Sequence, residues 1–290
     1  MCTKKKLGVC GPNWSNWKRR PSAWTACTAS PSKPAGLQPA CMLYCECLGR
    51  AEVKMTQPEI FSGFSEKTLS FFQELTENNN REWFAAQRRD YDEYVLQPAQ
   101  AFVVAMGERL RRLTLGITAD PRPDGSLFRI YRDTRFSPDK APYKTHLGIY
   151  FWEGKGPRLE CSGYYFHLEP PRLMLGGGIY VFPRPLLERY RQAAIDSEYG
   201  DELTAAIKKI TARPGFSLGG KHYKRLPPGT DPAQPNAELL LHNGLYAGWE
   251  TNIPAEFYSA ALIDYCYDKF RPLEPLHHWL TNLVNGKFDF

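Results

Sequence analysis

The residues of this chain that are best suited to chemistry lie together in one short segment, residues 128–146. The segment reads FRIYRDTRFSPDKAPYKTH and runs into the strand-like stretch LGIYF. It holds six basic or imidazole side chains and two carboxylates within 19 residues. Charged groups that lie between two strands must be solvated or paired. A dense mixture of both signs at such a turn therefore indicates an organised site.

The cations of this segment are candidates for holding an anion, because arginine offers a planar fork that matches phosphate or carboxylate oxygens and lysine offers a mobile point charge. The expected ligand contacts are Arg132, Arg135, Lys140 and Lys144. The alternative is a structural loop fastened by internal ion pairs, with Asp133 held by an adjacent arginine and Asp139 by a lysine. The ligand site is favoured, because five lysines or arginines stand against only two aspartates between residues 129 and 144.

Three side chains of the segment are candidates for catalysis: His146, Tyr143 and Asp133. A histidine beside lysine and tyrosine can act as a general acid or base near neutral pH, with the tyrosine as a proton donor. Two alternatives stay open. Asp133 and His146 could form a metal site with His167 and Glu169, although their spacing is not diagnostic. His146 could also simply be hydrogen-bonded inside a sheet. We assign neither a metal nor a cofactor.

A run of three glycines, residues 176–178, falls within a strand-like stretch. Glycine weakens a strand and usually marks a bulge or the close approach of another backbone or a ligand. The backbone N–H groups of Gly177 and Gly178 could therefore line the floor of the anion pocket. The alternative is close packing against a helix. Neither the phosphate-loop pattern nor the dinucleotide-binding glycine pattern is present.

These motifs carry a resemblance. The run over residues 128–146 resembles the signature of a conserved-hypothetical family, the domain of unknown function 2461. Three further stretches fit the same family, and they are NREWF at residues 80–84, the three glycines, and YKRLP at residues 223–227. The resemblance covers residues 58–285. It implies which positions belong together, and it implies no particular reaction.

The order of the expected elements predicts the fold class. Apolar residues at helical spacing predict helices at both ends of the chain, over residues 65–77, 81–94, 98–113, 185–195, 201–211, 260–270 and 273–284. Period-two alternation predicts strands grouped in the middle, over residues 127–131, 145–152, 162–169, 172–182 and 245–249. The links between the middle strands are short, which is typical of antiparallel pairing. We expect a single α+β domain with a central, mostly antiparallel sheet flanked by N- and C-terminal helices.

Charge and cysteine content separate the first 54 residues from the rest. They hold nine lysines or arginines and two glutamates, whereas the other 236 residues hold 28 basic and 29 acidic groups. Six of the eight cysteines lie in the first 47 residues. Since this stretch shows no helical or strand period, we expect residues 1–54 to be disordered or to precede the true start of translation. Residues 55–290 are expected to form the globular domain.

The same numbers bound the possible partners and location. A net charge of −1 after residue 54 removes the bulk-charge argument for nucleic acid. Two lone thiols there fit a reducing cytoplasm, and no apolar run approaches the ~20 residues that cross a bilayer. We therefore expect a cytoplasmic protein or enzyme with a small anionic ligand. The alternatives are a nucleic-acid-binding module, in which Tyr131 or Tyr150 stacks on bases, and an interaction domain without a ligand. The sequence assigns neither a substrate nor an oligomeric state.

Overall fold

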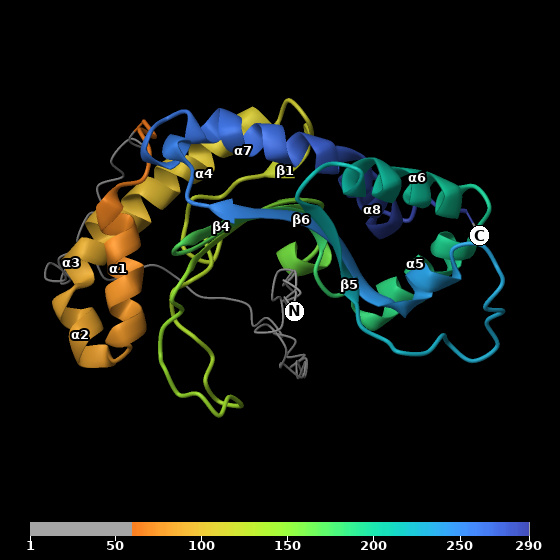
Figure 1. The fold of residues 1–290 in the computed structure, drawn as a ribbon, viewed down its shortest axis with the longest axis horizontal. Coiled ribbons are helices and arrows are strands. Elements are labelled where there is room, and N and C mark those ends of the chain that lie inside the picture. Colours follow the sequence, from red (N-terminus) through yellow and green to blue (C-terminus); the bar gives the residue numbers. More distant parts are fainter. Residues whose placement is uncertain (1–59, 290) are drawn as a thin grey trace, which may run out of the picture.

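The computed structural model of the chain describes residues 60–289 (Figure 1). The expectation for residues 1–54 lies outside these described residues. The α-helices are α1 (Glu66–Glu77), α2 (Arg81–Ala86), α3 (Arg88–Asp90), α4 (Gln97–Leu110), α5 (Arg184–Ile195), α6 (Tyr199–Thr211), α7 (Leu262–Phe270) and α8 (Glu274–Val284). The strands are β1 (Ile117–Thr118), β2 (Leu147–Glu153), β3 (Gly163–Glu169), β4 (Arg172–Ile179), β5 (Phe216–Lys221) and β6 (His242–Asn252). Shorter helical turns are η2 (Tyr91–Leu96), η3 (Arg158–Glu160), η4 (Ala237–Leu241), η5 (Ala255–Tyr258) and η6 (Arg271–Leu273).

All six strands form one sheet in the order β1-β2-β3-β4-β6-β5, and every neighbouring pair is antiparallel. Strands β2, β3 and β4 follow one another as a meander, and β6 returns to pair with β4 after α5, α6 and β5. The expected α+β domain with a central antiparallel sheet is therefore confirmed. Within the described part of the chain, no helix is long and apolar enough to cross a membrane.

Helices from both ends of the chain pack on one face of the sheet (Figure 1). Phe102 of α4 lies with its ring centroid 4.8 Å from that of Phe166 in β3, and Phe270 of α7 lies 5.3 Å from Tyr164. Tyr164, Phe166 and Leu168 alternate along β3 and are fully buried. Burying a large apolar side chain stabilises a fold by roughly 1.5–3 kcal/mol. This face therefore holds the main core, and it joins the two ends of the domain.

The opposite face carries glycine and tyrosine side by side, and we call it the glycine–tyrosine face. Antiparallel pairing aligns Tyr150 with Tyr165 and Gly176, and it aligns Gly163 with Gly178. A Cβ atom on Gly163 would lie 2.8 Å from the ring of Tyr150, so only glycine fits beneath that ring. The other members of the face in strands β2 to β6 are Gly148, Trp152, His167, Glu169, Arg172, Met174, Ser217, Gly219, Tyr246, Gly248, Glu250 and Asn252.

The sequence-based expectation of a strand over residues 127–131 is wrong. In the structure these residues make only isolated bridges, and the backbone N–H groups of Arg132 and Lys144 donate to the carbonyl oxygens of Pro142 and Ile130, both at 2.8 Å. The segment over residues 128–146 thus folds back on itself as an irregular hairpin. It extends from the sheet on the side opposite α4 and α7 (Figure 1).

A buried polar chain ties α8 to the sheet. The Oγ atom of Ser162 lies 3.0 Å from Nδ1 of His277, and Nε2 of His277 lies 3.1 Å from Oε2 of Glu153. Ser162 and His277 are buried, whereas Glu153 is about one-quarter exposed. The hydrogen bond from His277 lowers the pKa of Glu153. Serine, histidine and glutamate are the residue types of a hydrolytic triad. A substrate cannot reach the buried hydroxyl of Ser162, so these three residues form a structural contact, which we call the clamp.

We expect Ser162→Ala to destabilise the fold by about 1–3 kcal/mol, because it leaves Nδ1 of His277 buried without its hydrogen-bond partner. The free energy of unfolding in urea measures this loss. Ser70→Ala is the control, since Ser70 is exposed on α1 and bonds only to the carbonyl of Glu66. Equal stability of the two variants would contradict the clamp.

The clamp also predicts a pH dependence. A carboxyl group whose pKa is lowered in the folded state stabilises the fold above its ordinary value of 4.5, and that stabilisation is lost as the pH falls through the folded-state pKa. Glu153→Gln should therefore lower the free energy of unfolding at about pH 7 and change little at an acid pH below the folded-state pKa, where the carboxyl is protonated. The exposed Glu160 provides the control, Glu160→Gln. A loss in Glu153→Gln that is the same at both pH values would rule out the charge contribution.

Candidate functional site

Two imidazole rings meet where the hairpin of residues 128–146 joins the sheet. His146 directly precedes β2, and its ring lies 4.5 Å from that of His167 in β3, with 33° between the planes. The strand register pairs Gly148 of β2 with His167 of β3. His146 lies two residues before Gly148 in the chain, on the same side as His167. Because Gly148 has no side chain, the surrounding rings can close over it. A Cβ atom there would lie 2.9 Å from the hydroxyl of Tyr165 and 3.2 Å from the ring of Phe128.

His167 is the centre of a three-residue chain along β3. Residues at i, i+2 and i+4 point to one face of a strand, so Tyr165, His167 and Glu169 lie in a row. The hydroxyl of Tyr165 lies 2.9 Å from Nδ1 of His167, and Oε2 of Glu169 lies 3.4 Å from Nε2. Burial raises the pKa of Tyr165, so the phenol keeps its proton. The hydrogen bond from His167 lowers the pKa of Glu169, so the carboxylate is ionised and only accepts.

These two end groups fix the tautomer of His167. Since the carboxylate of Glu169 only accepts, Nε2 of His167 must carry hydrogen, and in the neutral ring Nδ1 then accepts from Tyr165. The imidazole is thereby held in one orientation against its neighbour.

His146 is the most strongly perturbed titratable group of this cluster. Burial, followed by the charges of His167, Lys144 and Arg132, lowers its pKa well below 6.5. Within residues 60–289 its ring nitrogens have no hydrogen-bond partner. At neutral pH His146 is therefore an uncharged imidazole with a lone pair that can accept a proton.

The arginines of the hairpin are held by its aspartates. Arg135 grips Asp133 through two hydrogen bonds of 3.0 Å, and Arg132 pairs with Asp139 at 2.5 Å. The pair of Asp133 with Arg135 is one of those that the alternative of a structural loop required. Asp139 pairs with Arg132 and not with Lys140 or Lys144, because its carboxylate reaches back across the hairpin.

The remaining cations of the hairpin find partners of other kinds. Nζ of Lys140 donates to the carbonyl of Thr134 at 2.9 Å, and Nζ of Lys144 donates to the carbonyl of Arg129 at 2.7 Å. Nη1 of Arg129 lies 4.0 Å from Oδ2 of Asp124, a residue that precedes the segment over residues 128–146. The three cations that the two aspartates do not pair therefore interact with backbone carbonyl oxygens or with the carboxylate of Asp124. The excess of positive charge remains, because a carbonyl group carries no net charge.

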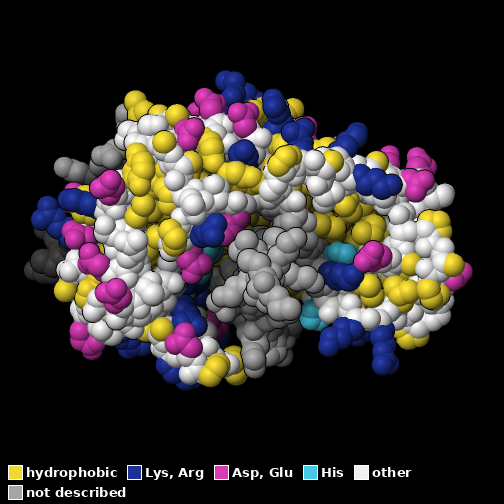
Figure 2. All heavy atoms as spheres, in the orientation of Figure 1, with side chains coloured by type: hydrophobic (Ala, Val, Ile, Leu, Met, Phe, Trp, Pro, Cys, Tyr) yellow, Lys and Arg dark blue, Asp and Glu magenta, His cyan; other side chains and the backbone are white. Residues whose placement is uncertain are grey.

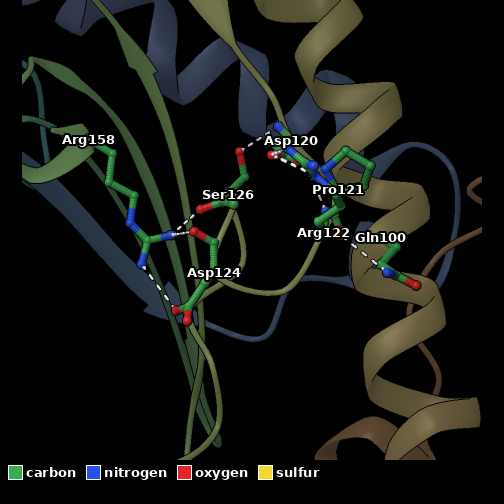
Figure 3. A network of polar contacts seen from close by, with 8 residues as sticks. Gln100, Asp120, Pro121, Arg122, Asp124, Ser126 and Arg158 are labelled. Atoms are coloured by element: carbon green, nitrogen blue, oxygen red, sulfur yellow. Dashed lines mark hydrogen bonds and ion pairs between the residues drawn. The ribbon is translucent and has the colours of Figure 1, made fainter. Parts of the chain in front are cut away.

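A second network fixes the turn from which the hairpin starts (Figure 3). Nη1 of Arg158 donates to the carbonyl of Asp124 at 2.9 Å and also to that of Gly125. The backbone N–H of Asp120 donates to Oγ of Ser126 at 3.0 Å. Asp124 has a positive φ of 65°, and these contacts hold that strained turn.

The same network places Phe128 beside Tyr165, the residue that bonds to His167. The guanidinium of Arg158 lies 4.4 Å from the centre of the Phe128 ring, and Nζ of Lys144 lies 5.5 Å from it. Both distances allow a cation–π interaction. Phe128 thereby holds two positive charges beside the glycine–tyrosine face.

The structure separates Tyr143 from the imidazole pair. Its ring stacks on Phe84 of α2 at 4.1 Å, and its backbone N–H and C=O both bond to the side chain of Asn79. Burial raises the pKa of Tyr143. These contacts fix Tyr143 in the aromatic packing of α2, whereas His146 faces β3. Asp133, the third catalytic candidate, is engaged by Arg135.

The two glycines predicted to line an anion pocket lie at the far end of the sheet from His167. A Cβ atom on Gly177 would lie 3.2 Å from the Leu273 side chain, so this glycine allows close helix packing. Gly178 pairs with Gly163, which lies four residues from His167 along β3. Tyr150 is buried and donates to the carbonyls of Gly178 and Cys161, so it cannot stack on a base.

A pocket of about 540 Å³ opens beside His167, between α1 and the turn that joins β3 to β4. Its lining consists of Phe72, Gln73, Thr76, Glu77, Thr145, His167, Glu169, Pro170, Pro171, Arg172, Met174 and Glu250. Sequence reasoning missed it because α1 and β6 contribute residues far from the hairpin. In the described part of the chain, no three His, Cys, Asp or Glu side chains are grouped as a metal site.

Comparison with known proteins identifies the family. No curated protein matches the chain significantly. A family model described as a conserved hypothetical protein family, DUF2461, matches residues 67–279. The matched region contains the hairpin, both imidazoles and every strand of the sheet. The chain therefore belongs to the DUF2461 family of conserved hypothetical proteins.

Proposed function

We propose that the imidazole pair and the adjacent cations bind a small phosphate- or carboxylate-bearing ligand, with His146 as the proton acceptor. The observation that carries the proposal is the contact between the rings of His146 and His167, 4.5 Å apart, close to the charges of Lys144 and Arg132 that lower the pKa of His146. A histidine in such surroundings stays neutral because protonation would add one more positive charge. An anion at this place would offset that repulsion, and the free nitrogens of His146 could bond to it.

The geometry supports proton transfer as well as binding. A general base must be unprotonated at the working pH and must reach the substrate proton, and it works best when its pKa lies near that pH. His146 meets the first condition through burial and its cationic neighbours, and stacking on the orientationally fixed His167 holds its ring. A carboxylate or phosphate bound by Lys144 would offset one of the charges that lower the pKa of His146.

Nucleic-acid binding is the weaker candidate. Tyr131 and Phe136 are 51% and 72% exposed and could stack on bases, but the neighbouring arginines already hold carboxylates. Figure 2 shows Lys and Arg interspersed with Asp and Glu on the visible face, without one continuous basic field. Binding through several phosphates requires such a field.

Anion binding should raise the pKa of His146. We expect its NMR-monitored pKa to lie below 6.5 in the free protein and to move upward with saturating acetate or phosphate, because a nearby negative charge favours the imidazolium. Acetate and phosphate added separately distinguish the two ligand groups, sodium chloride at equal ionic strength is the control, and His146→Asn identifies the resonance. An unchanged pKa under both anions would remove the proposal.

The role of Lys144 can be tested by removing its charge. Lys144→Met should weaken anion binding by roughly two- to five-fold, as expected for a partly exposed charge pair. It should also raise the pKa of His146 in the free protein, because one of the charges that lower it is gone. Lys155→Met, at an exposed turn after β2, is the matched control. If both variants behave alike, the positive field at His146 does not come from Lys144.

A further inference from the structure

The pocket between α1 and the β3–β4 turn has a chemistry unlike that of the hairpin. We propose that it binds a primary amine, or another organic cation, that carries a short apolar chain. This site goes beyond the anion site and does not depend on it, since its charged residues come from α1, β3, β4 and β6.

The charged groups of the pocket are mostly negative. Glu77, Glu169 and Glu250 line it together with a single cation, Arg172. The guanidinium of Arg172 lies 3.6 Å from Oε1 of Glu250, so it is already engaged with one of the three carboxylates. Glu77 has no ion-pair partner within residues 60–289. The pocket therefore repels anions and has an uncompensated place for a cation.

The end of α1 adds to this preference. Glu77 is the last residue of the 12-residue helix, and the last turn holds Glu74 and Glu77 without any lysine or arginine. Helix C-termini carry a partial negative charge that a cation stabilises and an acidic side chain opposes. The partial negative charge of the helix end and the three carboxylates therefore both favour a positively charged ligand.

The rest of the lining favours a chain next to that cation. Met174 and the two prolines at residues 170–171 supply apolar surface, and Gln73, Thr76 and Thr145 supply uncharged polar groups. A volume of about 540 Å³ falls within the ~300–1,000 Å³ usual for small-molecule pockets. An alkylamine satisfies both parts, because its methylene groups would cover Met174 and the prolines while its ammonium group reaches the carboxylates.

The experiment compares 1,4-diaminobutane with its uncharged analogue, butane-1,4-diol, by isothermal titration and thermal shift on the full chain. The diamine should bind and stabilise the protein, and the diol should not. Glu77→Gln should weaken diamine binding by roughly two- to five-fold. Glu74→Gln is the matched control, because Glu74 lies in the same helical turn outside the pocket lining.

Arg172→Gln provides a test with the opposite sign. It removes the one cation of the pocket and frees Glu250, so diamine binding should become stronger rather than weaker. Equal responses to the diamine and the diol would overturn the proposal. So would a diamine affinity unchanged in both Glu77→Gln and Arg172→Gln. Since neither variant touches His146, a failure here is distinguishable from a failure of the anion site.

Discussion

The alternation of side chains along β3 is the constraint on which the rest of the structure depends. Tyr164, Phe166 and Leu168 point to the helices, and the residues between them point to the glycine–tyrosine face. A shift of one residue in the pairing would exchange the two sets. It would bury the Tyr165–His167–Glu169 chain under α4 and α7 and expose three large apolar side chains. The core and the candidate site are therefore specified by the same register.

The glycine residues leave room for the aromatic rings on the glycine–tyrosine face. Gly148 leaves the space in which Phe128 and Tyr165 approach each other, and Gly163 leaves the space for the ring of Tyr150. Glycine in a strand interior costs conformational entropy, and aromatic rings laid across the neighbouring strands compensate part of that cost. The imidazole pair lies at the border of this face. The sheet thus provides a rigid floor, while the hairpin supplies the charges.

The sequence predicted the strands that show period-two alternation within their own residues. The strands expected over residues 145–152 and 162–169 are observed as Leu147–Glu153 and Gly163–Glu169. The edge strand Phe216–Lys221 was missed because two of its six residues are glycines, and Ile117–Thr118 is too short to show a period. Residues 127–131 have strand-like composition, but the hairpin supplies their backbone partners.

The site was less predictable, since it depends on contacts between distant segments. The motif residues were found by type and spacing, yet the choice of Arg132 as the partner of Asp139 depends on the curvature of the hairpin. The stack of His146 on His167 depends on strand register, and the contact of Ser162 with His277 joins residues 115 positions apart. No local pattern contains such information.

His167 links the two proposed sites physically. Its Nε2–H bonds to Glu169, which also lines the acidic pocket, while its ring stacks on His146. An ammonium group that approached Glu169 would compete with His167 for the same carboxylate. His167 would then lose the hydrogen bond that fixes the orientation of its imidazole ring. The ring of His146 stacks on that imidazole, so its own position depends on the same bond. A cation bound in the proposed pocket would therefore act on the proposed proton acceptor through the orientation of a single side chain.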